Sequence, residues 1–478
     1  ALVDSPCRSA CPANVDIPGY LALVGEGRIA EALRLHRERN PFAAVCARVC
    51  FHSCETKCRH AALDGTAVAI RGVKRFMADQ EIVIQLPEIR ENPENAKRKI
   101  AIIGAGPAGL SCGYFLARLG YKPVVFEGEE RPGGMLVQAI PAYRLPREIL
   151  AREVRMIERM GVEIRTGMKL GRDFTLQQLR DEGYEAVFLG VGAPQGAKMG
   201  IPGEDAEGVV DAMEFNKIYN LRGSVPVGRK VVVVGGGNSA VDAARTALRL
   251  GAESVTIVYR RTRDAMPAYE EEIEEAENEG VKLEMLVMPE EVLVEDGKVV
   301  GLRCRRMALA GFDRTGRRRP EAVGESFVMQ ADQVIAAIGQ TLNLDEILGS
   351  VELRRKWRNF IDANPVTGQT SVDWIFAGGD AVTGPASVVA AVGAGERAAV
   401  GIDYYLTGAF HAFWREDKPV EVPFDPALPP SKEPRAKLPT IPVERRRHSF
   451  EEVEHCWEAP VALRQAKRCL RCEYGKRK

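Results

Sequence analysis

The sequence predicts an α/β fold in which two Rossmann-like nucleotide-binding domains, one inserted in the other, follow a small helical domain. Two glycine-rich turns, beginning at Gly104 and Gly235, predict the nucleotide-binding domains, because each follows a strand-like run and opens a helix-like run. The third observation is a group of cysteines ahead of both turns, a pattern typical of metal ligands.

The composition is that of an ordinary globular chain. Its 478 residues leave room for two or three domains. With 45% hydrophobic residues and no net charge, nothing indicates a nucleic acid or membrane partner, and no apolar run reaches transmembrane length. The start resembles no secretory signal, and clustered cysteines indicate a reducing compartment, so we expect a cytoplasmic protein. Because the first residue is not Met, a removed or missing segment stays possible.

Residues 1–96 are predicted to form the helical domain. The apolar spacing indicates a helix or helix pair over 17–39, interrupted at Gly25 and Gly27, and another helix over 68–80. The sequence Asn-Pro-Glu-Asn at 92–95 is typical of a linker.

The first nucleotide-binding domain is predicted over 97–200 and 335–408. A strand at 99–103, a helix at 107–120 and a strand at 123–127 form a β-α-β unit, and another strand is expected at 186–189. Gly104 permits the tight turn, Gly106 lets the backbone approach a pyrophosphate, and Gly109 allows close packing of helix on strand. The helix N-terminus would attract the anion.

Three further features indicate that this first site holds FAD. Glu127 ends the second strand and can accept hydrogen bonds from a ribose diol. Gly134 belongs to a flexible stretch that can pass under the cofactor. Far downstream, Gly379 and Asp380 follow a strand, and the Asp can bind a ribityl chain, while a helix over 384–399 would point its N-terminus at the flavin ring.

The second nucleotide-binding domain is predicted over 201–334. A unit from Arg229 through a helix at 239–251 to a strand at 254–259 repeats the fingerprint, and further strands are expected at 281–287, 299–307 and 333–338. The residues expected to bind nucleotide are Gly235, Gly237, Asn238 and Ala240. The acidic run at 270–279 is interpreted as the solvated face of a helix.

Two arginines after the last strand favour NADPH over NADH. Proteins that bind NAD usually carry an acid at this point, whereas Arg260 and Arg261 can pair with a 2′-phosphate. The alternative is that both arginines are merely a solvated strand end.

Eight of the eleven cysteines fall into patterns that predict two [4Fe–4S] clusters. Six precede residue 59, and a Cys-x₂-Cys pair lies in a proline-rich and charged C-terminal arm, residues 409–478, next to a helix predicted over 460–470. Four thiolates can hold one cluster, so eight can hold two. The proposed ligands are Cys7, Cys11, Cys46, Cys50, Cys54, Cys58, Cys469 and Cys472. Structural zinc is the alternative, whereas Cys112 and Cys304 are predicted core residues.

Between residue 7 and about residue 408, the chain resembles the small subunit of bacterial glutamate synthase and its relatives. These include the large subunit of the electron-bifurcating NADH-dependent ferredoxin:NADP oxidoreductase and the N-terminal part of dihydropyrimidine dehydrogenase. The resemblance rests on Cys11-Pro-Ala-Asn-Val-Asp-Ile-Pro-Gly-Tyr20, the cysteines of 50–58, both glycine-rich turns, Met266-Pro-Ala268 and Ala377-Gly-Gly-Asp380. It implies FAD, NAD(P)H and two low-potential [4Fe–4S] clusters.

The chain departs from that family at both predicted clusters. The family has a Cys-x₂-Cys pair upstream of Cys7, so we expect Cys469 and Cys472 to fold back and join Cys7 and Cys58. The family also uses a Glu or Gln ligand at a position that matches the neighbourhood of Lys74 here, and Lys cannot serve. We therefore expect Cys46 to complete a set with Cys11, Cys50 and Cys54.

These features predict an iron–sulfur flavoprotein subunit that moves electrons between NADPH and a partner protein, with hydride transfer between the nicotinamide and the flavin. No acid–base catalytic residue is expected. The favoured setting is an electron-bifurcating NAD(P)/ferredoxin oxidoreductase complex with an NADH-oxidising flavoprotein or ferredoxin-type subunit. The alternative is a glutamate synthase large subunit as partner. A disulfide reductase is rejected, because neither nucleotide-binding unit carries a Cys-x₂-Cys. An enzyme with its own organic substrate and a relay with a vestigial nucleotide site are less favoured.

Overall fold

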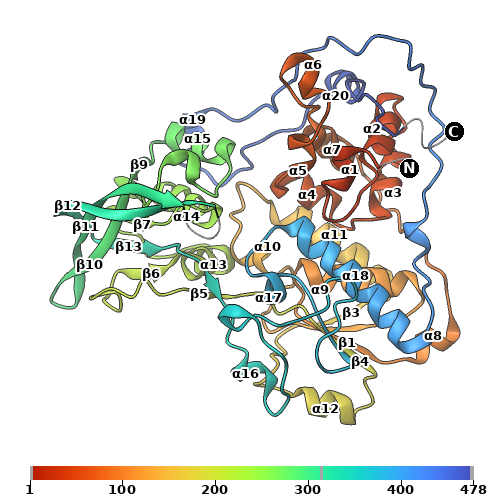
Figure 1. Cartoon of the computed structure of the whole chain (residues 1–478), viewed down its shortest axis with the longest axis horizontal. Coiled ribbons are helices and arrows are strands. Elements are labelled where there is room, and N and C mark those ends of the chain that lie inside the picture. The colour runs from red at the N-terminus through yellow and green to blue at the C-terminus, as the bar shows by residue number, and fades with distance from the viewer. Residues whose placement is uncertain (1–3, 313–315, 474–478) are drawn as a thin grey trace.

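The computed structural model describes residues 4–312 and 316–473 (Figure 1). It confirms the predicted fold class, because a helical N-terminal part is followed by two separate parallel sheets. Among the helices of these residues, none combines the length and the apolar character needed to cross a membrane.

The N-terminal part is a compact group of short helices. They are α1 (Pro6–Ser9), α2 (Ile17–Gly25), α3 (Ile29–Arg37), α4 (Ala43–Val49), α5 (Ser53–Thr56), α6 (Ala61–Asp64) and α7 (Ile70–Asp79). Asp16 begins α2 by accepting the backbone N–H of Gly19. Gly27, at φ +74°, reverses the chain before α3, so the predicted helix pair is confirmed. Val24, Val45 and Val73 are fully buried where these helices meet.

The first parallel sheet has the strand order β15-β4-β1-β2-β3. Its strands are β1 (Ile100–Ile103), β2 (Val124–Phe126), β3 (Glu163–Arg165), β4 (Ala186–Leu189) and β15 (Ile375–Ala377). Its helices are α8 (Pro93–Lys97), α9 (Pro107–Arg118), α10 (Met135–Gln138), α11 (Arg147–Arg159), α12 (Leu176–Asp181), α16 (Asp345–Leu348), η2 (Trp357–Asn359), α17 (Asp380–Thr383) and α18 (Val388–Thr407). Because β15 pairs with β4, the chain returns to this sheet after building the second unit.

The second parallel sheet has the order β6-β13-β7-β8-β9. Its strands are β6 (Val209–Asp211), β7 (Lys230–Val234), β8 (Ser254–Tyr259), β9 (Lys282–Met285) and β13 (Gln333–Ala336), with α13 (Ala212–Arg222), α14 (Asn238–Arg249), η1 (Arg263–Ala265) and α15 (Glu270–Glu279). An antiparallel sheet of β10 (Val287–Glu295), β11 (Lys298–Phe312) and β12 (Arg318–Gln330) extends from this unit (Figure 1). Strands β5 (Gln195–Gly196) and β14 (Gln340–Thr341) pair where the chain leaves the first unit and returns.

The C-terminal arm passes over the surface and links the second nucleotide unit to the helical part (Figure 1). It contains η3 (Phe413–Arg415), α19 (Val443–Arg446) and α20 (Ala459–Ala466). Helix α19 packs against α15, and α20 packs against α2 and α7. The arm therefore returns the last cysteines to the first ones.

Several predicted elements differ from the structure. The linker predicted at 92–95 is wrong, because Asn92 accepts the backbone N–H of Glu94 and starts α8. The helix predicted over 460–470 ends at Ala466, and the one predicted over 384–399 begins at Val388 and continues to Thr407. Strand β12 was not expected, because its charged residues hide the alternation that marks a strand.

Candidate functional site

The first glycine-rich turn joins β1 to α9 and can be built only with glycine. Gly104 has φ +98°, a left-handed conformation that strains other residues. A Cβ on Gly109 would collide with the backbone oxygen of Gly104. Gly106 stands directly before α9, so the first backbone N–H groups of the helix are free to meet an anion. The turn therefore fits a pyrophosphate.

Glu127 braces this turn from the end of β2. One carboxylate oxygen accepts the backbone N–H of Ala105 at 2.7 Å, and the other accepts that of Glu129 at 2.9 Å. Burial raises the pKa of Glu127, while these hydrogen bonds act in the opposite direction. Each carboxylate oxygen has a second lone pair, so the predicted ribose contact is compatible with this bracing role.

Two segments remote in sequence meet the start of α9. Gly134, at φ +54°, lies so close to Gly106 that a Cβ on it would stand 2.9 Å from the Gly106 Cα. Gly379, at φ +68°, approaches Ala108 equally closely and delivers Asp380 to the same place. Burial raises the pKa of Asp380 to about 6. These close backbone contacts leave no room for side chains around the N-terminus of α9. A narrow space lined by backbone fits a flat dinucleotide such as FAD.

The second glycine-rich turn repeats this geometry between β7 and α14. Gly235 has φ +141°, and a Cβ there would collide with the backbone oxygen of Ala337. Gly237 stands directly before α14, and Ala240 is fully buried against the sheet. Asn238 accepts the backbone N–H of Tyr269 at 3.2 Å, which ties the turn to the segment before α15.

The two arginines after β8 lie in different environments. Arg260 is exposed beside the second glycine-rich turn. Arg261 is only 8% exposed, and its Nε donates to the backbone oxygen of Arg318 on β12 at 3.0 Å. Only Arg260 has a guanidinium that faces solvent, so the predicted pair is not a symmetric clamp.

Four cysteines from the two ends of the chain face one small pocket. We call Cys7, Cys58, Cys469 and Cys472 the outer cysteine group. Cys7 lies on α1, Cys58 follows α5, and the other two follow α20. The exposed side chains of Lys57 and Arg59 line the same pocket, which places this group near the surface.

The remaining four predicted ligands also gather in one place. We call Cys11, Cys46, Cys50 and Cys54 the inner cysteine group; burial chiefly raises the pKa of Cys11, Cys46 and Cys54, and the nearby Cys50 thiol raises it further. Asn40 donates its side-chain N–H to the Cys46 Sγ at 3.4 Å, and the backbone N–H of His52 donates to the Cys50 Sγ at 3.4 Å. Lys74, which projects from α7, is buried near these four thiols.

Burial disfavours the free thiolate at several cysteines of both groups. Burial raises the pKa of Cys46, and of Cys7, to about 12. Within 4–312 and 316–473, no three cysteine, histidine or acidic side chains converge closely enough for a single metal ion. A [4Fe–4S] cube is larger than one ion, so four thiols around a common space fit it.

The inner cysteine group contacts both nucleotide units. The ring of Tyr269 lies 4.6 Å from that of Phe51 and stacks on His52, next to Cys50. A Cβ on Gly393 of α18 would collide with the backbone oxygen of Pro12, next to Cys11. The segments that carry the inner group therefore contact both nucleotide units.

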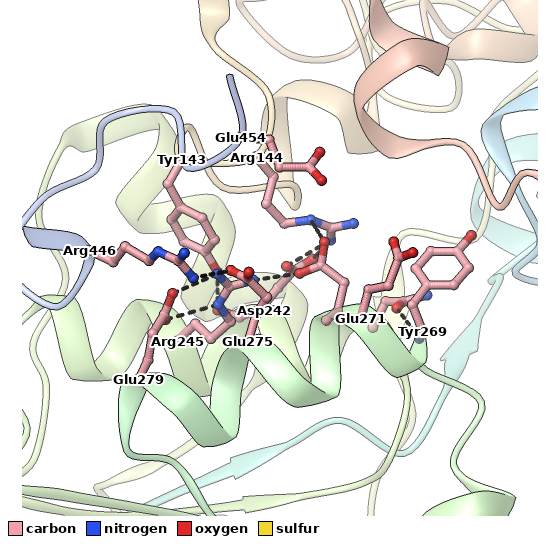
Figure 2. Close-up of polar contacts among 12 residues, drawn as sticks. Tyr143, Arg144, Asp242, Arg245, Tyr269, Glu271, Glu275, Glu279, Arg446 and Glu454 are labelled. Atoms are coloured by element: carbon pink, nitrogen blue, oxygen red, sulfur yellow. Dashed lines mark hydrogen bonds and ion pairs between the residues drawn. The ribbon is translucent and has the colours of Figure 1, made fainter. Parts of the chain in front are cut away.

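An ionic network along α15 joins several parts of the molecule (Figure 2). Arg144, from the first nucleotide unit, donates to both carboxylate oxygens of Asp242 on α14 at 2.8 Å. It also lies 3.0 Å from Glu272 on α15. Arg446, on the arm, pairs with Glu275 at 2.6 Å.

The same network reaches the helical part through Arg71 on α7. Arg71 pairs with Glu454 of the arm at 2.7 Å and lies 3.6 Å from Glu271 on α15. We call this set the interdomain network; its members are Arg71, Arg144, Asp242, Glu271, Glu272, Glu275, Arg446 and Glu454. The prediction that 270–279 is simply a solvated face is therefore wrong, since several of its acids pair with arginines of other elements.

Comparison with known families identifies both halves of this arrangement. Residues 98–395 match the pyridine nucleotide-disulphide oxidoreductases. The chain belongs to that family. Residues 2–85 match dihydropyrimidine dehydrogenase domain II, which is described as a 4Fe-4S cluster domain. This member of the family is an iron–sulfur flavoprotein oxidoreductase that uses FAD, NAD(P)H and [4Fe–4S] chemistry, as predicted.

Curated relatives extend over nearly the whole chain. It is 40% identical over 98% of its length to the NADP(+)-dependent formate dehydrogenase subunit beta of Moorella thermoacetica, covering 71% of that protein. It is 38% identical over 98% of its length to the NADPH-Fe(3+) oxidoreductase subunit beta of Geobacter sulfurreducens, covering 75%. The glutamate synthase [NADPH] small chain of Escherichia coli is 38% identical over 84% of this chain and 88% of its own. The predicted resemblance is confirmed.

Solved structures support the fold of the nucleotide-binding part. FprA of Mycobacterium tuberculosis in complex with NADPH covers 65% of this chain and 85% of its own, with a TM-score of 0.56 and 20% identity. Thioredoxin reductase of Lactococcus lactis covers 66% of this chain and 100% of its own, with a TM-score of 0.51 and 22% identity. None of the cysteines among the described residues forms a disulfide, and Cys112 and Cys304 are fully buried as predicted.

Sequence reasoning missed the residues that connect the sites. Tyr269 and Asn40 touch the inner group from other segments, and no local pattern marks such long-range contacts. Lys74 is different, because a lysine at an apolar position of an amphipathic helix signals a buried charge that needs a partner.

Proposed function

We propose that this chain takes electrons from NADPH at the second glycine-rich turn and delivers them to a partner subunit beside the outer cysteine group. One observation carries the proposal: the eight cysteines form two groups, of which the inner contacts both nucleotide units and the outer lies near the surface. When bound, FAD would supply hydride exchange with the nicotinamide, and [4Fe–4S] clusters would supply one-electron transfer.

Each group of residues would hold one cofactor. FAD would be held by Gly104, Gly106, Gly109, Glu127, Gly134, Gly379 and Asp380. NADPH would be held by Gly235, Gly237, Asn238, Ala240 and Arg260. Arg261 would fix the loop beneath Arg260. The inner and outer cysteine groups would hold one cluster each. The corresponding units are 1–96, 97–200 with 335–408, 201–334 and the arm 409–478.

The relatives support a partner subunit and NADPH. Three of them are named as a subunit or a small chain, and their names contain NADPH or NADP(+). Because Lys57 and Arg59 are exposed over the outer group, a partner with an acidic face would dock there most readily.

The double substitution Cys469→Ser with Cys472→Ser tests this function. We expect loss of one cluster, hence about half of the bound iron, while NADPH still bleaches the flavin and reduction of the partner subunit stops. Cys456→Ser is the matched control, since Cys456 lies on the arm and belongs to neither group. Unchanged iron content in the double variant would contradict the outer group.

A second candidate setting is an electron-bifurcating complex. It is favoured by the arm, which completes the outer group here, whereas the glutamate synthase small chain matches only 84% of the chain. Electron paramagnetic resonance of the anaerobic protein after NADPH, with NADH as control, separates the two settings. Cluster signals with NADPH alone favour a simple relay to a partner such as a glutamate synthase large subunit. Bleached flavin without cluster signals, in a sample shown to contain iron, favours bifurcation.

A further inference from the structure

Lys74 is a buried cation among the inner cysteine group. Its side chain projects from α7, which packs against α4, the helix that carries Cys46. Lys74 is only 7% exposed. A lysine is very seldom buried unless negative charge compensates it, so its surroundings show what the site is built to hold.

The strongest electrostatic partners of Lys74 are the thiols of Cys50, Cys46, Cys54 and Cys11. The neighbouring His36 adds no charge, because burial, with Lys74 and Arg37, lowers its pKa well below the usual range.

We propose that the Lys74 ammonium compensates the negative charge of the cluster held by the inner cysteine group and raises its reduction potential above that of the outer cluster. A cluster becomes one charge more negative when reduced, so a cation fixed in a low-dielectric interior favours the reduced state. The inference rests on the proposed function, because it requires that the inner group hold a cluster.

The buried arginines beside the outer group are already paired with acids, since Arg468 pairs with Asp64 and Arg471 with Glu473, each at 2.9 Å. Arg59, which interacts with Cys472, is exposed, and Lys57 is exposed as well. Water and salt screen exposed charges, so they change a potential less than a buried ammonium does. The chain therefore makes the inner cluster, which lies next to the nucleotide units, the easier one to reduce.

The test is an anaerobic redox titration of the full chain followed by electron paramagnetic resonance. In Lys74→Met, a neutral side chain of similar length, we expect one of the two midpoint potentials to fall by at least the equivalent of a tenfold change in equilibrium constant, about 59 mV for a one-electron couple. The second midpoint should stay unchanged. Lys74→Arg, which keeps the charge, should restore most of the difference, and Lys57→Met should move neither potential by as much.

The outcomes separate the inference from the function on which it rests. Two clusters with unchanged potentials in Lys74→Met would overturn the role of Lys74 and leave the relay intact. Equal shifts in Lys74→Met and Lys74→Arg would also overturn it, because they would report packing rather than charge. Loss of iron in Lys74→Met but not in Lys74→Arg would support charge compensation, whereas loss in both would overturn it. Absence of an inner cluster in the unsubstituted protein would remove the proposed function itself.

Discussion

At the scale of single residues, Arg260 and Arg261 are neighbours with different roles. The exposed guanidinium of Arg260 is free of the restraint that holds Arg261 against the backbone of β12. An arginine can pair with a 2′-phosphate only if its planar face is accessible, since the bidentate geometry is strict. Nucleotide preference should therefore depend on Arg260, and Arg261 should matter mainly for local stability.

Arg260→Ala should raise the KM for NADPH at least tenfold and leave the KM for NADH unchanged, because a hydrogen bond between charged groups contributes about 1.5–3 kcal/mol. Steady-state kinetics with an artificial electron acceptor measures both values. Arg263→Ala is the control, since Arg263 pairs with Glu277 at 2.8 Å and should not affect the preference. An unchanged ratio of the two KM values in Arg260→Ala would assign the 2′-phosphate contact elsewhere.

The residues that could be predicted from the sequence are those fixed by local backbone geometry. Gly104 and Gly235 must be glycine because the turn after each strand requires a positive φ, and such turns have a recognisable spacing. Glu127 was predicted beside the nucleotide, but the backbone N–H groups it accepts depend on the folded turn. Site residues that depend on one segment of the chain can be predicted from the sequence, whereas contacts between remote segments cannot.

At the scale of elements, α14 and α15 are joined by a buried ion pair. Glu279, at the end of α15, is fully buried and accepts hydrogen bonds from Arg249 at 2.6 Å and from Arg245 at 2.7 Å. Burial alone raises the pKa of Glu279, but these two arginines lower it to about 2. The acidic composition of α15 does not indicate this pairing, since its partners come from another helix.

The lowered pKa of Glu279 predicts a definite pH dependence. Because the folded pKa lies below the ordinary value of 4.5, the carboxylate stabilises the fold above about pH 4.5. This stabilisation should disappear as the pH falls from there toward 2. Glu279→Gln should thus lower the stability of the second nucleotide unit by about 3–5 kcal/mol near neutral pH, as for other broken buried pairs, and by progressively less in acid.

Thermal unfolding monitored between pH 7 and pH 3 checks this expectation for α15. The matched control is Glu253→Gln, because Glu253 pairs with Arg229 on the surface, where both side chains are exposed. That substitution should change the Tm little at any pH. A loss of stability in Glu279→Gln that is the same at pH 7 and pH 3 would show that packing, and not charge, is the cause.

At the scale of the whole molecule, the fold class and the order of its units follow from the sequence, but their mutual placement does not. The spacing of the sequence is enough to predict the two glycine-rich turns and the return of the chain to the first parallel sheet at β15. The contact of α19 with α15 depends on the path of a proline-rich arm, which has no periodic pattern. The interdomain network is the physical result of that path.

The interdomain network couples four parts of the chain through few residues. Arg144 belongs to the first nucleotide unit, Asp242 to the second and Arg446 to the arm (Figure 2). Arg71 belongs to the helical part. Arg144 and Asp242 are 9% and 7% exposed at their side chains. Loss of one buried charge leaves its partner unpaired in a low dielectric, which costs more than the pair contributes. The network should therefore act as a unit.

Asp242→Asn should consequently loosen the molecule at several remote places at once. The change preserves shape but leaves the Arg144 guanidinium without one of its two carboxylates, so we expect hydrogen–deuterium exchange to accelerate at 143–145, 270–279 and 440–454 together. The strands of the first sheet should keep their protection, because their pairing does not depend on the network. Glu163→Gln, at an exposed pair with Arg165, should leave all of these segments unchanged. Faster exchange confined to the residues next to Asp242 would mean that the ion pairs are independent, and that the nucleotide units are held to the arm by packing alone.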